Sequence, residues 1–431
     1  MIQLGEVADF EMGQAPPGTE CNMDGDGTVF VKAGEFSKLY PLEREWTTKP
    51  LKFGKHGDVF ICVVGATAGK LNLGIDCAIG RSVAAIRPKP ILETKFLYYQ
   101  LLPSVLKLRA SSAGSAQGVI SKKQLSDIRI TLPSISEQAE IVAEIEKQFS
   151  RLDEAVANLQ RVKANLKRYK ASVLKDAVEG RLVPTEAELA RREGRSFETG
   201  EQLLLRILEA RRIQWSGRGK YKEAAGADAG NLPELPEGRV WVTLGQLTSS
   251  VKDGPHFSPK YADEGVPFIS GGNIRPEGID FSSTKFITPE LHAELSKRCK
   301  PEPGDLLYTK GGTTGIARVN TEKREFNVWV HVAVLKLMKF VHPFYLQHAL
   351  NSPHCYRQSQ KYTHGVGNQD LGLTRMVWIT VPLPPHAEQL RIVDEVERRL
   401  SLVRGVEVEV DANLKRAQAL RQATLQQAFE V

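Results

Sequence analysis

The sequence predicts an α+β protein in which two α/β globular domains are separated by two long helices forming an antiparallel coiled coil. Three observations support this prediction. Residues 136–180 carry apolar residues at every seventh position, and a second copy of this stretch closes the chain. The block that precedes each stretch is a distant copy of the other block. A repeat of this length indicates a duplicated architecture, for which a pseudo-twofold relation is the simplest arrangement.

The first helical stretch is expected to bury an apolar seam against another helix. Its heptad pattern lasts for about four heptads, which is typical of a long helix paired with a second one. The pattern becomes polar at Lys163 and Lys170, so we do not expect a uniform zipper. The predicted seam residues are Ile145, Phe149, Leu152, Val156, Leu159, Leu166 and Val173.

The second helical stretch repeats the first closely. Each follows a Leu-Pro pair, at 132–133 and 383–384, and the tetrapeptide NLKR occurs at 165–168 and again at 413–416. Since proline ends a strand and often precedes a helix start, both helices should begin just after these pairs. In the second copy we place the seam at position 407 and at Val396, Leu400, Val403, Val410 and Leu414.

The repeats divide the chain into five segments. We expect a globular domain at 1–134, a helix at 135–180, a linker with one or two amphipathic helices at 181–238, a second globular domain at 239–383 and a second helix at 384–431.

The two globular blocks share short anchor sequences. The strand-like segment 29–34 matches 267–272, and Gly65-x-Thr67-x-Gly69 matches Gly311-x-Thr313-x-Gly315. The apolar run at 59–66 predicts a buried strand, and 91–109 predicts a helix broken at Pro103. Because the loops between the anchors differ, the two scaffolds suggest one task performed on two different targets.

Composition narrows the functional classes. The chain is 41% hydrophobic and 25% charged with a net charge of +7, which favours a polyanionic partner without proving one. Its five cysteines form no CxxC pair, and its first residues lack the features of a signal peptide, so we expect a cytoplasmic protein with no membrane partner.

Motifs for catalysis and cofactor binding are missing. Gly65 to Lys70 looks like part of a phosphate-binding loop, but a P-loop has four residues between its glycines and Ser or Thr after the lysine. We therefore interpret it as a tight turn that lets the backbone approach a neighbouring strand or DNA. The sequence has no HExxH, no GxGxxG opening a helix after a strand, and no Asn-Pro-Pro or Asp-Pro-Pro. We predict a non-catalytic chain that holds no metal and no cofactor.

Basic residues in the loops stand beside amides and hydroxyls, the groups that bind phosphates and base edges. The DNA-binding candidates in the first block are Lys32, Ser37, Lys38, Lys70, Arg81, Gln117, Lys122 and Lys123. Those in the second block are Lys252, His256, Asn273, Arg275, Lys310, Arg318, Arg357, Gln360, Lys361, Asn368 and Gln369.

Four stretches carry a resemblance to a known family. They are the Leu-Pro pair followed by Glu137-Gln138, NLKRYKASVLKDAVEGRL at 165–182, LPELPEGRVWVTLGQL at 232–247 and PFISGGNIRPEG at 267–278. Together they resemble the specificity subunits of type I restriction–modification systems. The resemblance implies that each globular domain is a target-recognition domain that reads one half of an asymmetric bipartite double-stranded DNA target. It also implies two modification subunits that use S-adenosylmethionine to methylate adenine, and restriction subunits that use ATP and Mg.

Two other classes stay open at this point. One is an enzyme, either a fused restriction–methylation protein or a lone nuclease, which would modify or cut DNA by itself. The other is a coiled-coil adaptor with lectin-like globular domains. In the preferred interpretation the helices act as a spacer that sets the gap between two half-sites read in opposite senses.

Overall fold

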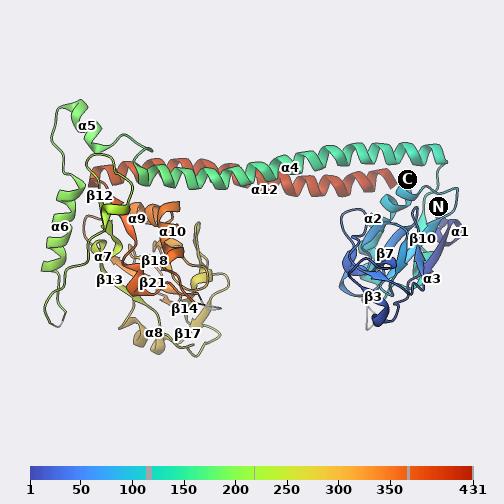
Figure 1. Cartoon of the computed structure of the whole chain (residues 1–431), viewed down its shortest axis with the longest axis horizontal. Coiled ribbons are helices and arrows are strands. Elements are labelled where there is room, and N and C mark those ends of the chain that lie inside the picture. Colours follow the sequence, from blue (N-terminus) through green and yellow to red (C-terminus); the bar gives the residue numbers. More distant parts are fainter. Residues whose placement is uncertain (113–118, 218, 366–368, 430–431) are drawn as a thin grey trace. The chain divides into compact units, whose positions relative to one another are not determined.

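The computed structural model describes residues 1–112, 119–217, 219–365 and 369–429 and divides into two compact units (Figure 1). The first unit combines Met1–Val162 with Glu409–Val431, and the second is Lys163–Val408. Each of the two long helices therefore contributes one part to each unit.

The first unit begins with a mixed α/β domain. Its elements in chain order are β1 (Ile2–Gln3), α1 (Leu4–Val7), β2 (Ala8–Met12), η1 (Gly18–Glu20), β3 (Cys21–Asn22), β4 (Thr28–Val31), η2 (Ala33–Glu35), β5 (Trp46–Thr47), β6 (Phe53–Gly54), β7 (Val59–Cys62), η3 (Gly65–Thr67), β8 (Leu71–Leu73), β9 (Cys77–Ile79), β10 (Val83–Pro88), α2 (Thr94–Ser112), α3 (Lys122–Ser126), β11 (Arg129–Ile130) and the long helix α4 (Ile135–Glu179).

The second unit follows a similar plan. Its elements are α5 (Glu186–Glu193), α6 (Gly200–Ile213), η4 (Ala229–Asn231), β12 (Val240–Thr243), α7 (Leu244–Leu247), β13 (Thr248–Asp253), β14 (Val266–Ile269), η5 (Gly271–Asn273), β15 (Ile274–Arg275), β16 (Gly278–Ile279), β17 (Lys285–Ile287), α8 (Pro289–Ser296), β18 (Leu306–Thr309), β19 (Ala317–Val319), β20 (Asn327–Val328), β21 (Val332–Leu337), α9 (Pro343–Leu350), α10 (Pro353–Tyr362), α11 (Leu373–Met376), β22 (Thr380–Leu383) and the long helix α12 (His386–Phe429).

Each unit is built on a four-stranded antiparallel sheet of the same order. The order is β2-β10-β7-β8 in the first unit and β13-β21-β18-β19 in the second. The registers also correspond, since Ala85 lies opposite Glu11 and Val334 lies opposite Lys252. The predicted α+β fold and its internal repeat are confirmed.

Both faces of each central sheet are covered. In β7, Val59 and Ile61 pack into one core, and Phe60 and Cys62 pack into another. Because successive strand residues point to opposite faces, a strand buried on both sides needs an unbroken apolar run. The buried strand expected from the run at 59–66 is therefore confirmed.

A second sheet in each unit contains the matched anchor strands, with the order β3-β5-β4-β9-β6 in the first unit and β17-β14-β20 in the second. Strand β4 pairs in parallel with β9, where Phe30 lies opposite Ala78, and β14 pairs in parallel with β20, where Phe268 lies opposite Asn327. These two segments occupy the same topological position, as the sequence match between 29–34 and 267–272 predicts.

The long helices lie side by side and run antiparallel within each unit (Figure 1). In the first unit Arg421 pairs with Asp153 at 2.8 Å, while Thr424 bonds Gln148 at 3.1 Å. Residue numbers thus rise along α12 as they fall along α4. In the second unit Lys170 pairs with Glu407 at 2.7 Å.

The predicted seam differs from the structure at one position. Position 407, which we assigned to the apolar seam, holds Glu407, so this assignment is wrong; its carboxylate pairs with Lys170, where the first helix is also polar. The buried seam residues are Ile145, Phe149, Val173, Val396, Val403 and Val410. Those half-buried are Leu152, Val156, Leu159, Leu166, Leu400 and Leu414.

The predicted helix break at Pro103 is also wrong, because α2 continues through this residue. Proline removes one helical hydrogen bond. The turns that precede it are held by Phe96, Leu97 and Leu101, which are at most 1% exposed. Their burial offsets the lost bond.

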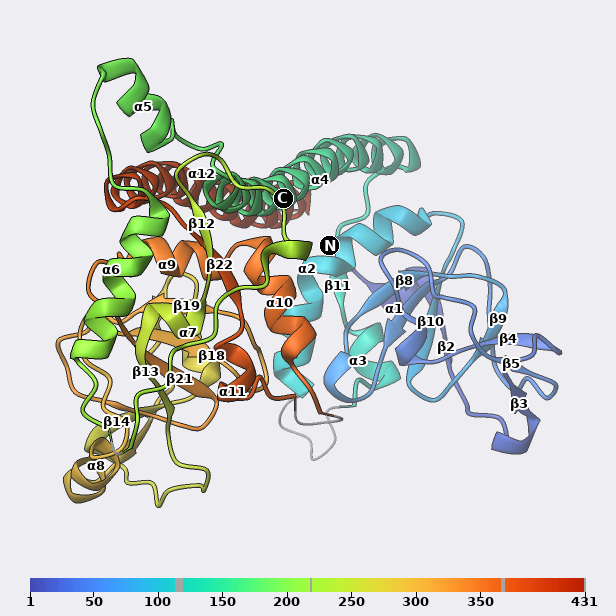
Figure 2. The ribbon, with the colours of Figure 1, turned by 60° about the vertical axis from the view of Figure 1, so that its left-hand side comes forward.

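The sequence predicts one or two amphipathic helices in the linker, and the structure has two, α5 and α6. On α6, Leu203 and Ile207 are fully buried and pack with Val242 and Leu244 in the second unit's core, so α6 lies beside β12 and α7 (Figure 2). Among the residues that the structure describes, no helix is long and apolar enough to cross a membrane.

Candidate nucleic-acid interface

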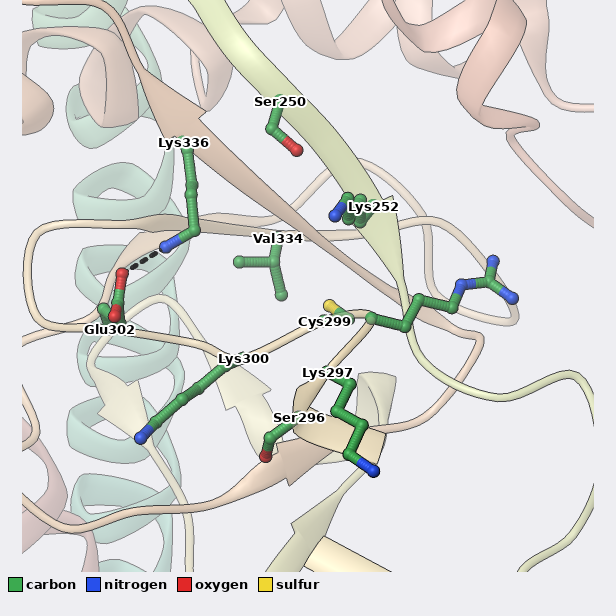
Figure 3. A pocket seen from close by; sticks show the side chains of 10 residues that line it. Ser250, Lys252, Ser296, Lys297, Cys299, Lys300, Glu302, Val334 and Lys336 are labelled. Atoms are coloured by element: carbon green, nitrogen blue, oxygen red, sulfur yellow. Dashed lines mark hydrogen bonds and ion pairs between the residues drawn. The ribbon is translucent and has the colours of Figure 1, made fainter. Parts of the chain in front are cut away.

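A basic pocket lies on one face of β13 and β21 in the second unit. It has a volume of about 290 Å³ and is lined by Ser250, Lys252, Ser296, Lys297, Arg298, Cys299, Lys300, Glu302, Val334 and Lys336 (Figure 3). Strand pairing explains the arrangement, since Ser250 lies opposite Lys336 and Lys252 lies opposite Val334 on the same face of the sheet.

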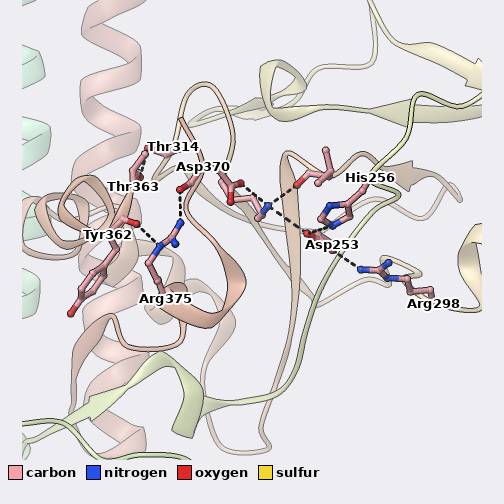
Figure 4. A network of polar contacts seen from close by, with 10 residues as sticks. Asp253, His256, Arg298, Thr314, Tyr362, Thr363, Asp370 and Arg375 are labelled. Atoms are coloured by element: carbon pink, nitrogen blue, oxygen red, sulfur yellow. Dashed lines mark hydrogen bonds and ion pairs between the residues drawn. The ribbon is translucent and has the colours of Figure 1, made fainter. Parts of the chain in front are cut away.

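A buried carboxylate at the end of β13 is contacted by two cationic side chains and a histidine beside this pocket. Asp253 is 2% exposed and accepts from Arg298 Nη2 at 3.0 Å. His256 Nε2 lies 3.2 Å and Lys310 Nζ 3.4 Å from its other oxygen (Figure 4). Carboxylates this deeply buried need such partners, because an unpaired buried charge is costly.

Lys310 connects this carboxylate to the neighbouring loops. Its side chain is 3% exposed, and Nζ donates to Asp370 Oδ1 at 2.7 Å and to the Val330 carbonyl at 3.1 Å. The structure therefore places this predicted DNA contact inside the domain, where it joins β13, β18, the residues before β21 and the loop that contains Asp370.

The loop between α10 and α11 is held at both ends. Arg375 donates to the Asp370 carbonyl and to the Tyr362 carbonyl, each at 2.9 Å (Figure 4). Isolated antiparallel β-bridges pair the backbone of Asp370 with that of His364 and of Gly311. Gln369, a predicted contact, is exposed on this loop, and Asn368 lies outside the described residues.

The glycine turn after β18 packs closely against its neighbours. A Cβ on Gly311 would lie 2.1 Å from His331 Nδ1, and one on Gly315, whose φ is +93°, would lie 2.5 Å from Ser359 Oγ. Larger residues would clash at both places. This turn thus approaches the protein's own side chains, and Gln360 Nε2 holds it by donating to Thr314 Oγ1 at 3.0 Å. The close approach was predicted for the matching turn of the first unit, where a Cβ on Gly65 would meet nothing within 4 Å.

Asn273, a predicted DNA contact, is used by its own loop. It is 8% exposed; its Oδ1 accepts from the Ser270 amide and its Nδ2 donates to the Asp280 carbonyl, both at 2.9 Å. Its amide is thus occupied in shaping the turn after β14.

The remaining candidates of the second unit lie nearer the surface. Arg275 pairs with Asp280 at 3.0 Å, Arg318 donates to the Pro276 carbonyl at 3.1 Å, and Arg357 donates to the Pro353 carbonyl at 3.2 Å. The exposed members of the set are Lys252, His256, Arg275, Arg357, Gln360, Lys361 and Gln369.

In the first unit, the segment 32–40 brings four candidates together. Lys70 donates to the Phe36 carbonyl and Ser37 Oγ to the Tyr40 carbonyl, both at 2.6 Å. Lys38 pairs with Asp153 of α4 at 2.7 Å. Lys32 pairs with Glu45, and this hydrogen bond raises the pKa of Lys32.

Three further first-unit candidates, Arg81, Lys122 and Lys123, are exposed, and the last two begin α3. Gln117 lies outside the described residues.

Sequence reasoning missed the residues that support these loops, namely Asp253, Arg298, Asp370 and Arg375. Their pairing joins segments far apart in the chain and leaves no local pattern. It also missed Phe257, which is 58% exposed beside His256. An exposed aromatic next to a basic loop is a signal that could have indicated it.

Two units of one topology with different loops, carried on paired helices, define a protein with a duplicated domain. Residues 1–168 and 236–402 each match the type I restriction modification DNA specificity domain. The chain belongs to this family and contains two copies of the domain.

Individual relatives agree with this assignment. The chain is 24% identical over 444 residues to the EcoBI specificity subunit of a type I restriction enzyme from Escherichia coli. The matched region covers 99% of this chain and 85% of that protein. It is 32% identical over 161 residues to a protein of Methanocaldococcus jannaschii named as the MjaX specificity subunit, over 36% of this chain and only 37% of that protein.

A solved structure shares the fold. Its subject is "complex assembly and conformational transition of the type I R-M system", and it matches with a TM-score of 0.65 and 19% identity over 99% of this chain and 96% of its own.

Proposed function

We propose that this chain is the non-catalytic DNA-recognition subunit of a type I restriction–modification complex, and that each globular domain reads one half of an asymmetric bipartite target. One observation carries the proposal. The two units repeat one sheet order and register but present different loops at matching strand ends. After β7 the turn is followed by exposed Lys70, whereas the matching turn after β18 is followed by Ile316. Equal scaffolds with unequal loops suit one task on two DNA sequences.

The chemistry would then come from partner subunits. We propose that two modification subunits bind S-adenosylmethionine and methylate adenine, and that restriction subunits use ATP and Mg. Exposed apolar side chains on α12 support a docking role, since Leu402 and Val406, one helical turn apart, are 62% and 45% exposed. Because the substrate would be cellular and incoming DNA, we also propose a cytoplasmic location.

The test compares the chain alone with the chain plus its modification subunits. Each sample receives DNA and labelled S-adenosylmethionine, and the methylated positions are read by sequencing. We expect no transfer by the chain alone and adenine methylation at one bipartite sequence by the complex. Methylation by the chain alone would favour the enzyme class.

Two deletions extend this test. Removing residues 1–134 or residues 239–383 should each abolish recognition of the bipartite sequence by the complex. If the complex still methylates the same sequence without either domain, the adaptor interpretation is favoured and ours is wrong.

A further inference from the structure

The basic pocket on β13 and β21 contains five cationic side chains and a single carboxylate, that of Glu302. Three of the cations have partners: Arg298 pairs with Asp253 at 3.0 Å, Lys300 with Glu325 at 2.7 Å and Lys336 with Asp305 at 3.0 Å.

Lys252 and Lys297 differ from the other three cations. Both are exposed, and neither has an ion-pair or hydrogen-bond partner for its ammonium group within the part of the chain that the structure describes. Like charges that line one pocket repel one another, and an anion bound in the pocket would reduce this repulsion.

The first unit shows which part of the pocket the scaffold itself requires. Lys336 and Asp305 correspond in register to Arg87 and Asp58, and that pair also forms, at 2.7 Å. This ion pair is therefore common to both domains and belongs to the fold.

Lys252, in contrast, has an acidic residue as its counterpart in the first unit. Glu11 lies opposite Ala85 where Lys252 lies opposite Val334, and Glu11 neutralises Lys52 at 2.7 Å. Ser250 likewise stands where the first unit has Asp9. The scaffold thus accepts an acidic strand face, and the cationic face of the second unit is a specific feature of that domain.

We propose that this pocket binds a phosphate group of the DNA backbone, and that the matching face of the first unit does not. The inference rests on the proposed function, because it takes DNA as the ligand. Lys252 and Lys297 supply the charge, and the hydroxyls of Ser250 and Ser296 line the same pocket and can donate to phosphate oxygens (Figure 3). Arg298, which lines the pocket and binds Asp253, connects this phosphate site to the loop network around Lys310.

The experiment measures DNA affinity against salt for the complex with its modification subunits. The variant Lys252→Ala/Lys297→Ala should weaken target and non-target DNA about equally, by roughly tenfold, and should reduce the slope of log K against log salt by about 1. The methylated sequence should not change, because phosphate contacts carry no direct base information. Lys323→Ala, an exposed lysine of the same unit outside the pocket, is the matched control and should leave affinity and slope unaltered.

Two further variants test the asymmetry between the units. Lys252→Glu introduces the charge that the first unit carries and should weaken binding more than Lys252→Ala does. Glu11→Gln, on the matching strand of the first unit, should leave affinity within about twofold.

Three outcomes are decisive. If the double variant keeps the DNA affinity and salt slope of the wild type, in a complex that still methylates one bipartite sequence, the pocket does not bind a DNA phosphate. The proposed function would remain intact. A wild-type complex without sequence-specific methylation would overturn the proposed function itself. The third outcome is that inorganic phosphate raises the melting temperature of the complex only when Lys252 and Lys297 are both present, while the affinity for DNA is the same with and without them. The occupant is then a free phosphate, and the DNA proposal is wrong.

Discussion

Lys310 shows how a residue can matter for DNA recognition without lying on the surface. Its side chain is 3% exposed, and its ammonium group pairs with both Asp253 and Asp370. Both carboxylates belong to segments that carry predicted contacts, His256 next to Asp253 and Gln369 next to Asp370. Lys310 is therefore a positioning residue for the loops of the second domain.

Replacing Lys310 with Met should destabilise the second unit by about 3 kcal/mol, because breaking a buried ion pair leaves charge uncompensated. The complex should lose the half-sequence read by the second domain and keep the half read by the first. Urea unfolding measures the first effect, and sequencing of methylated DNA measures the second. Lys323→Met, at an exposed position outside the set of predicted DNA contacts, serves as the control. Lost recognition with unchanged stability would instead indicate a direct DNA contact.

The sequence could not show that Lys310 and Asn273 are buried whereas Lys252 and Gln369 are exposed. Each is a polar residue near a strand end or a turn, and each fits a DNA-contact pattern equally well. Burial depends on partners distant in the chain, such as Asp370 for Lys310. Residue type therefore predicted the composition of the candidate set, whereas tertiary pairing decides which members reach the surface.

Elements were predicted well where their pattern was long and regular. The heptads indicated α4 and α12, and the apolar run indicated β7, because periodicity reports which faces are buried. Short elements escaped prediction: α3 spans only Lys122–Ser126, and its start depends on the Ser121 cap that accepts from the Gln124 amide. Pro103 misled the prediction of α2 because local propensity yields to packing.

Two helix starts in the second unit make its stability dependent on pH. His342 is the N-cap of α9 and His354 lies in the first turn of α10. Burial lowers the pKa of both, and it lowers the pKa of His331, where the charge of Lys310 adds to the effect. A positive charge at a helix N-terminus is also unfavourable.

We therefore expect the second unit to lose stability as the pH falls below about 6.5, the value for an unfolded histidine. The unfolded chain binds these protons more readily than the folded one, so the free energy of unfolding drops toward acid pH. In a Trp46→Phe variant the remaining tryptophans, at 215, 241, 329 and 378, all belong to the second unit and report its unfolding.

Replacing His331, His342 and His354 with Gln should flatten this profile between pH 8 and 5.5. The first unit contains a single histidine, the exposed His56, and should change less over the same range. An equally steep profile in the triple variant would show that other groups cause the acid sensitivity.

For the whole molecule, duplication was the most informative property of the sequence. Matching anchors predicted matching sheets, and the structure bears this out down to the register of β10 and β21. The duplication also explains why function could be inferred without any catalytic motif, because two scaffolds that differ mainly in their loops imply two related targets. The DNA sequence itself could not be predicted, since base readout depends on loop geometry.

The length of α4 leads to a prediction about the gap between the two half-sites. Along the chain, α4 connects the first domain to the second unit in one unbroken helix of 45 residues. Inserting four residues after Asn158 adds about 6 Å of helix, close to two base pairs of DNA. A matching insertion after Arg416 in α12 keeps the Asp153–Arg421 pair on one side and the Lys170–Glu407 pair on the other.

If the paired helices act as the spacer, the methylated sequence of this variant should keep both half-sequences while its gap grows by about two base pairs. Sequencing of DNA methylated by the complex gives the gap directly. Four residues inserted after Gly226, in the irregular part of the linker, provide the control and should leave the gap as it was. An unchanged gap with intact half-sequences would mean that the spacing is set outside α4 and α12, by the partner subunits or by the DNA itself.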